Sequence, residues 1–194
     1  GESYIPAKEA KYGLQYHPVM HEIGLQDGDQ VLSMDQKPIE SISEIAKNIF
    51  LEDVKVMQVK RGDSIINIDI PNDFSKVLLA KEVKMVATYQ IPTVVDSVLA
   101  GSNAEKGGLM KGDSIVSIDN LSIPYFHQFT SEAKKHSNLT IQLGVYRGGQ
   151  LDTLSVLVSE AGTLGFATKG PDRFLKIETR EYGFFEALPA GISM

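Results

Sequence analysis

Residues 24–35 read GLQDGDQVLSMD, and residues 108–119 read GLMKGDSIVSID, 84 positions further along the chain. Six of the twelve positions are identical, and three more exchange one aliphatic residue or methionine for another. Both stretches contain a Gly-Leu-x-x-Gly-Asp turn followed by a segment in which apolar and polar residues alternate. Such alternation indicates a half-buried strand. The chain therefore contains the same turn and the same strand twice.

The repeat extends well beyond these twelve positions. Further matches at nearly the same spacing are Pro6 with Pro92, Ile42 with Phe126, Ile45 with Phe129, and Arg61-Gly62 with Arg147-Gly148. A repeat of roughly 85 residues suits a small domain and is long for a solenoid. We therefore expect one domain over residues 1–84, a second over 85–172, and a separate C-terminal segment over 173–194.

The second copy shows the plan of one domain most clearly. Residues 93–99 and 114–119 read as strands, and a short helical turn at 104–108 begins after Ser102 or Asn103. Pro124 opens a longer helix whose apolar face is Phe126, Phe129 and Ala133. Residues 139–146 and 154–158 alternate again, across a turn at 147–150. The expected fold is α+β, with two copies of a small twisted, mainly antiparallel sheet or partial barrel capped by one long and one short helix.

Composition excludes several classes of function. The net charge is −6 and the pI is about 5.2, so a nucleic-acid partner is not expected. There is no cysteine, which rules out disulfides, thiolate zinc sites and a cysteine nucleophile. No Gly-x-Ser-x-Gly pattern is found. His17 and His21 have a metal-like spacing, but position 25 is leucine, so the segment does not read His-Glu-x-x-His and no metal is assigned. No catalytic residue is expected in this chain.

The turn, the alternating strand that ends in aspartate, the helix and the strand that ends in Arg-Gly together resemble a bacterial PDZ domain. The resemblance is most complete over residues 96–113, DSVLAGSNAEKGGLMKGD, and it covers about residues 8–170. It implies two tandem PDZ-like domains in the circularly permuted form, in which the strand beside the binding groove comes last.

PDZ domains bind an extended peptide, usually a C-terminus, as an added strand between a sheet edge and the long helix. The resemblance implies that the carboxylate-binding loop of the second copy is Leu164-Gly165-Phe166-Ala167. Phe126, Phe129 and Thr130 would line the helix side of the groove. A bulky β-branched residue in place of Gly165 should then abolish peptide binding and leave the fold largely intact.

The first copy departs from this pattern. Its equivalent of the carboxylate-binding loop, taken as residues 77–80, reads VLLA and has no glycine. We therefore do not expect the first copy to bind a carboxylate in the usual way. The candidates for the helix side of its groove are Ile42, Ile45 and Ile49.

The C-terminal segment narrows the family further. Residues 173–191, RFLKIETREYGFFEALPAG, resemble the part of site-2-type zinc intramembrane proteases that leads from the PDZ pair to the next transmembrane helix. Tyr182-Gly183 with Ala187 fits the family pattern there, and Phe184, Phe185 and Leu188 would meet the membrane surface near residues 182–194. The alternative is a C-terminal helix packed on the second domain.

This resemblance implies a periplasmic segment of a bacterial inner-membrane protein. The parent enzyme would hold zinc outside this chain, which would need no cofactor of its own. The PDZ pair would act as a size filter or sensor, with peptide or protein C-termini of membrane substrates as its partners. Two alternatives remain: a peptide-binding PDZ pair of a soluble periplasmic serine protease, and a non-enzymatic scaffold or secretion component.

Overall fold

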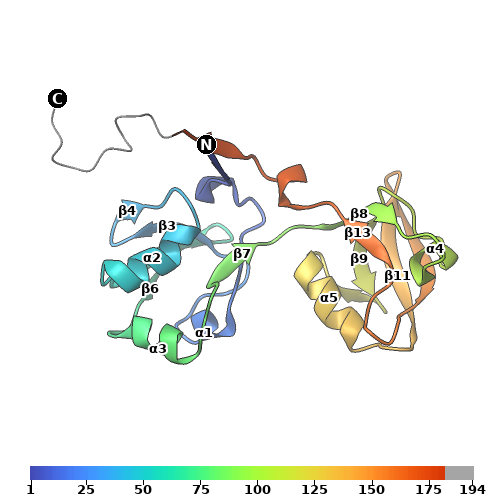
Figure 1. Ribbon diagram of the computed structural model, residues 1–194, viewed down its shortest axis with the longest axis horizontal. Helices are drawn as coiled ribbons and strands as arrows, with labels where there is room; N and C mark the ends of the chain where they lie inside the picture. Colours follow the sequence, from blue (N-terminus) through green and yellow to red (C-terminus); the bar gives the residue numbers. More distant parts are fainter. Residues whose placement is uncertain (182–194) are drawn as a thin grey trace. The chain divides into compact units, whose positions relative to one another are not determined.

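The computed structural model describes residues 1–181, which form two compact units (Figure 1). Unit 1 contains Gly1–Tyr89 and the described residues from Leu175 onward, and unit 2 contains Gln90–Phe174. Between residues 1 and 181 no helix is long and apolar enough to cross a membrane.

Unit 1 is built on a four-stranded antiparallel sheet with the strand order β4-β3-β5-β6. Two shorter ladders join β2 to β7 and β1 to β14. The strands are β1 (Glu2–Tyr4), β2 (Leu14–Tyr16), β3 (Gln30–Met34), β4 (Lys37–Pro38), β5 (Val56–Arg61), β6 (Ser64–Asp69), β7 (Ala87–Tyr89) and β14 (Glu178–Arg180). The helices are η1 (Ala7–Glu9), α1 (Pro18–His21), α2 (Ser43–Leu51) and α3 (Phe74–Ala80).

Unit 2 has one larger antiparallel sheet with the strand order β12-β11-β9-β8-β13, and β10 pairs with β9. Its strands are β8 (Thr93–Val98), β9 (Ser114–Ile118), β10 (Leu121–Ser122), β11 (Thr140–Arg147), β12 (Gln150–Leu157) and β13 (Phe166–Thr168). Its helices are α4 (Asn103–Lys106), α5 (Phe126–Lys134) and η2 (Pro171–Arg173). Each unit therefore consists mainly of antiparallel strands with one short and one long helix, as the sequence predicts, and unit 1 adds α3.

The repeated aspartates at the strand ends shape the same hairpin turn in both units. Asp35 and Gln36 have positive φ angles, as do Asp119 and Asn120, which is the backbone of a type I′ turn. The Asp35 carboxylate accepts the N–H groups of Lys55 and Val56. The repetition at these positions therefore reflects a structural requirement of the fold.

The aspartates of the Gly-Asp turn are buried, and each forms an ion pair with a partly exposed arginine. Asp29 and Asp113 are fully buried, with exposed fractions of 0% and 1%. Arg61 donates two hydrogen bonds of 2.8 Å to Asp29 and one to the Gly24 carbonyl. Arg147 contacts Asp113 in the same way, at 2.7 and 2.8 Å. The pair fastens the turn to the end of the central hairpin in each unit.

The ion pair in unit 2 predicts a sensitivity to acid. Burial alone would raise the pKa of Asp113, but hydrogen bonds from Arg147 and from the Met110 N–H outweigh it and lower this pKa below 3.8. A carboxyl whose folded-state pKa is depressed contributes stability above its unfolded pKa and loses it as the pH falls. The free energy of unfolding of unit 2, measured with urea, should therefore decrease as the pH falls below 3.8. The double variant Asp113→Leu/Arg147→Met should show a shallower decline, and an identical decline would contradict the assignment.

The structure divides the chain differently from the boundaries expected at residues 84 and 172. Residues 85–89 belong to unit 1, because β7 pairs with β2 through Tyr16 and Ala87. The chain also returns to unit 1 at Leu175, where β14 pairs with β1. Both pairings join residues far apart in sequence, and the repeat spacing carries no trace of them.

Candidate functional site

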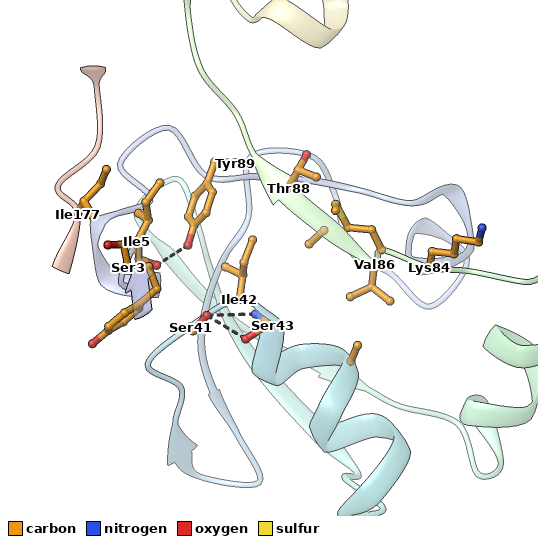
Figure 2. Close-up of a pocket in the computed structure, with 14 residues that line it drawn as sticks. Ser3, Ile5, Ser41, Ile42, Ser43, Lys84, Val86, Thr88, Tyr89 and Ile177 are labelled. Atoms are coloured by element: carbon orange, nitrogen blue, oxygen red, sulfur yellow. Dashed lines mark hydrogen bonds between the residues drawn. The ribbon is translucent and has the colours of Figure 1, made fainter. Parts of the chain in front are cut away.

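Helix α2 and strand β7 border an apolar pocket of about 660 Å³ in unit 1 (Figure 2). Its described lining residues are Ser3, Tyr4, Ile5, Ser41, Ile42, Ser43, Ala46, Lys84, Met85, Val86, Ala87, Thr88, Tyr89 and Ile177. Most of these side chains are aliphatic or aromatic. The pocket therefore suits an apolar ligand.

The backbone of β7 is available to an additional strand. Within residues 1–181, β7 pairs with β2 alone. The His17 N–H donates to the Val86 carbonyl, so Val86 faces β2. Backbone groups alternate along a strand, which turns those of Ala87 and Tyr89 away from β2. An edge of this kind is a template for a further strand.

The two ends of the pocket differ in chemistry. Lys84 marks one end in Figure 2, and it is the one charged residue among the described residues that line the pocket. At the other end, the Tyr89 hydroxyl donates a 2.5 Å hydrogen bond to the Ile5 carbonyl, and Ile177 lies nearby. An extended ligand would therefore meet a cation at one end and the side chains of Tyr89, Ile5 and Ile177 at the other.

Unit 2 has a corresponding strand and helix in β13 and α5. The Gly165 carbonyl accepts the Leu99 N–H at 2.9 Å, and the Leu164 carbonyl accepts the Ala104 N–H at 2.8 Å. By the same alternation, the backbone groups of Phe166 face away from β8. The Phe166 ring meets Phe129 edge to face, with 5.4 Å between the ring centroids. An aromatic cluster therefore forms this part of unit 2.

The structure separates the predicted helix residues of unit 2 into two groups. Phe126 and Thr130 are half-buried and lie one turn apart, whereas Phe129 is 4% exposed and belongs to the core. The Thr130 hydroxyl donates to backbone carbonyls of its own helix, at 3.0 Å. Of the predicted loop residues, Leu164 is buried and Ala167 is exposed.

The helix of unit 1 likewise has groove-lining and core residues, and two residues predicted to line the groove lie in the core. Ile42 lines the pocket, but Ile45 and Ile49 are 0% and 5% exposed and lie in the core. Positions i and i+4 share one face of a helix, so the second apolar lining residue on the helix side is Ala46, which sequence reasoning missed. The apolar stripe from which Ile45 and Ile49 were taken is the face that packs on the sheet.

The predicted equivalent of the carboxylate-binding loop in unit 1 is also wrong. Residues 77–80 form the end of α3, where Leu78 is fully buried. The hydrogen bonds give the true correspondence, because the Val86 carbonyl accepts the His17 N–H as the Gly165 carbonyl accepts the Leu99 N–H. The unit 1 counterpart is therefore residues 85–88, which also lack glycine. Helix α3 has no helical counterpart in unit 2, and it shifts the spacing on which the prediction relied.

Gly165 has a structural role that changes the expected effect of its replacement. Its φ is +96°, and an added Cβ would lie 2.3 Å from the Cβ of Ser102. Ser102 caps α4 by accepting the Glu105 N–H. A β-branched residue at position 165 would therefore strain the backbone and displace this cap, so the expectation of an intact fold does not hold.

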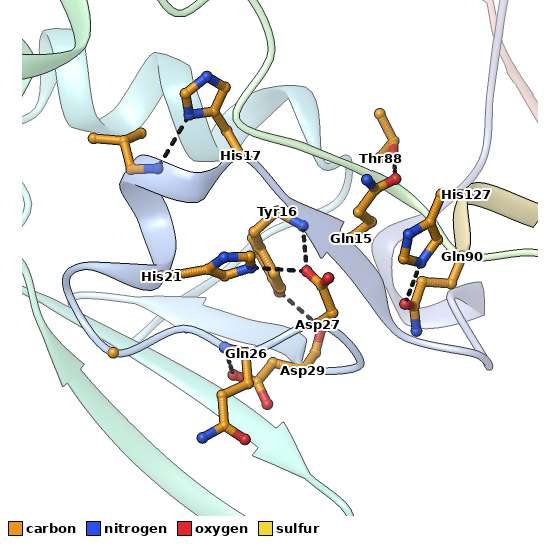
Figure 3. Close-up of polar contacts among 12 residues, drawn as sticks. Gln15, Tyr16, His17, His21, Gln26, Asp27, Asp29, Thr88, Gln90 and His127 are labelled. Atoms are coloured by element: carbon orange, nitrogen blue, oxygen red, sulfur yellow. Dashed lines mark hydrogen bonds and ion pairs between the residues drawn. The ribbon is translucent and has the colours of Figure 1, made fainter. Parts of the chain in front are cut away.

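The two histidines with metal-like spacing make other contacts (Figure 3). His17 Nδ1 accepts the Val19 N–H and caps α1, and His21 Nε2 lies 2.9 Å from an Asp27 carboxylate oxygen. Among residues 1–181 no group of three or more His, Asp or Glu side chains is placed to hold a metal ion. The described part of the chain therefore does not fit the zinc expected of the parent enzyme, and no step is assigned to it.

Comparison with known proteins agrees with this geometry. Residues 66–146 match the family model of the PDZ domain. Protease RseP of Photorhabdus luminescens is 42% identical over 62 residues, which are 32% of this chain and 27% of that protein. The matched part thus spans about a quarter of the relative.

The segment predicted to approach a membrane is described only in part. Residues 178–180 form β14 and pair with β1. The remaining predicted features of this segment, Tyr182, Gly183, Phe184, Phe185, Ala187 and Leu188, lie outside the described residues.

Proposed function

We propose that the chain is a tandem of two PDZ-like modules, each of which binds an extended peptide end as an additional strand. The observation that carries this proposal is the edge of β7 beside the apolar pocket of unit 1. A strand added there would bond to the backbone of Ala87 and Tyr89 and place alternate side chains against α2. Strand β13 and helix α5 would serve unit 2 in the same way.

We further propose that both modules are circularly permuted. The strand that pairs with β8 is β13, which follows it in the chain, and β7 likewise follows its partner β2. The match to the PDZ family runs from residue 66 to residue 146, across the boundary between the units. Such a match supports a permuted pair. Across the boundary, the last segments of the first module are followed by the first segments of the second, which is the order that these segments have within one unpermuted domain.

The parent protein we propose is a zinc-dependent intramembrane protease of the site-2 type, with this chain as its periplasmic part. The supporting observations are the PDZ domain and the similarity to Protease RseP. In this role the modules would bind C-termini of membrane substrates and limit which substrates reach the active site. The chain would contribute binding and selection, and its parent would contribute the catalytic residues.

Peptide titration followed by NMR tests the binding function. A pentapeptide that ends in valine with a free carboxylate should shift the amide signals of β7 and α2, and those of β13 and α5. Its C-terminal amide should bind at least about tenfold more weakly, since a hydrogen bond to a charged group contributes about 1.5–3 kcal/mol. Methylation of the peptide nitrogens that face β7 should weaken binding, whereas methylation of the alternate nitrogens should not. Absence of shifts at both grooves would contradict the proposal.

A further inference from the structure

The ribbon formed by β1 and β14 closes one end of the unit 1 pocket. Three residue pairs join the strands, from Glu2 with Arg180 to Tyr4 with Glu178. The Arg180 guanidinium lies 5.0 Å from the centre of the Tyr4 ring and 2.6 Å from a Glu40 carboxylate oxygen. These contacts hold Ile177, which directly precedes β14, at the wall of the pocket.

The ribbon is also tied to the strand that borders the pocket. The Tyr89 hydroxyl at the end of β7 donates to the carbonyl of Ile5, just beyond β1. Glu40, which holds Arg180, stands two residues before Ile42 on the opposite wall. Because both walls are fastened to the ribbon, the closed end and the width of the pocket depend on the same few contacts.

The length of β7 sets how much ligand fits before this wall. The strand has three residues, and at about 3.3 Å per residue it spans roughly 10 Å. A peptide paired with β7 would reach the Tyr89–Ile5 contact after about three residues. Any residue further along would be directed away from the pocket.

The other end of the pocket suits a negative charge. Lys84 is exposed, and no carboxylate among residues 1–181 lies within ion-pair distance of it. It lies three residues before β7, next to Met85, which is the counterpart of Leu164, in a loop that lacks the glycine of unit 2. A lysine ammonium is a compact charge on a flexible stem, so it can reach a terminal carboxylate there.

We infer that unit 1 takes the last three residues of an apolar chain end, with the carboxylate beside Lys84 and the β1–β14 ribbon as a clasp that limits ligand length. This inference rests on the proposed peptide-binding function. It assigns specificity to Lys84 and to two residues outside the PDZ resemblance, Ile177 and Arg180.

Peptides of different length test the clasp on the whole chain, by NMR at the unit 1 amide signals. The tripeptide Val-Ala-Val and a heptapeptide with the same end and four added leucine or alanine residues should bind wild type with affinities within about twofold. The Arg180→Glu variant places a second carboxylate beside Glu40, and their repulsion should release the ribbon. The heptapeptide should then bind about tenfold more tightly than the tripeptide, because the surface that Ile177 covers becomes accessible. Ile177→Ala gives the same test with a smaller disturbance, should Arg180→Glu unfold unit 1.

The charge of Lys84 is tested separately. In Lys84→Met the preference for a carboxylate over an amide should fall from about tenfold to near onefold. Lys47→Met, which removes an exposed lysine of α2 that does not line the pocket, should leave the preference unchanged.

The outcomes distinguish this inference from the function on which it rests. If no peptide binds unit 1 in any variant, the proposed function itself fails there. If peptides bind and the heptapeptide is already favoured in wild type, or gains nothing in both ribbon variants, the clasp is overturned. If Lys84→Met keeps the carboxylate preference, the role of Lys84 is overturned.

Discussion

Replacement of Arg61 by methionine is expected to destabilise unit 1 by about 3–5 kcal/mol, because it leaves the buried Asp29 carboxylate without its partner. Asp29 is 0% exposed, and after the exchange only the Gln26 N–H remains to it from the side-chain contacts described. The Gly24 carbonyl loses a donor as well. Hydrogen exchange of the β3 and β5 amides measures this loss within unit 1.

The repeat supplies the control for this experiment. Arg147→Met removes the same contacts in unit 2. It should raise the hydrogen-exchange rates of the β9 and β11 amides by a similar factor and leave those of unit 1 unchanged. Removal of both charges in Asp29→Leu/Arg61→Met should recover most of the stability, since a buried ion pair exchanged for apolar residues is often neutral. A double variant as unstable as Arg61→Met would show that the arginine acts through packing alone.

The ion pair also shows what a repeated sequence does and does not reveal. The aspartates repeat at a spacing of 84 and the arginines at 86, so both were visible as matches. Their contact was not, because it joins a turn to a hairpin over 30 residues away. The one available signal was that opposite charges repeat together in both copies, and it was not used to predict the contact.

The groove residues were predicted less well than the turns, for two physical reasons. A helix that packs on a sheet and also borders a groove has two apolar faces, and periodicity marks only the core face with Ile45 and Ile49. Helix α3 occurs in one copy only, so a constant spacing placed the loop at residues 77–80 rather than 85–88. The pairing of β14 with β1 depends on tertiary contacts and left no sequence pattern.

The second large effect is expected at Gly13, where strand β2 begins. Its φ is +73°, and an added Cβ would lie 2.1 Å from the backbone oxygen of Gly28. Two hydrogen bonds join these segments, from the Gly28 N–H to the Leu14 carbonyl and from the Leu14 N–H to the Asp29 carbonyl. Their loss at about 1 kcal/mol each, with about 1 kcal/mol of left-handed strain, predicts that Gly13→Ala costs about 3 kcal/mol.

Gly101→Ala is the matched control, because Gly101 has the same φ of +73° and nothing within 4 Å of its added Cβ. It should cost only the strain, about 1 kcal/mol. The difference between the two variants in urea unfolding therefore measures the close approach of β2 to Gly28. Because β2 carries β7, Gly13→Ala should also weaken peptide binding to unit 1 while unit 2 binds normally. An equal loss of unfolding free energy in the two variants would mean that β2 shifts without losing its hydrogen bonds. Peptide binding to unit 1 would then be unchanged.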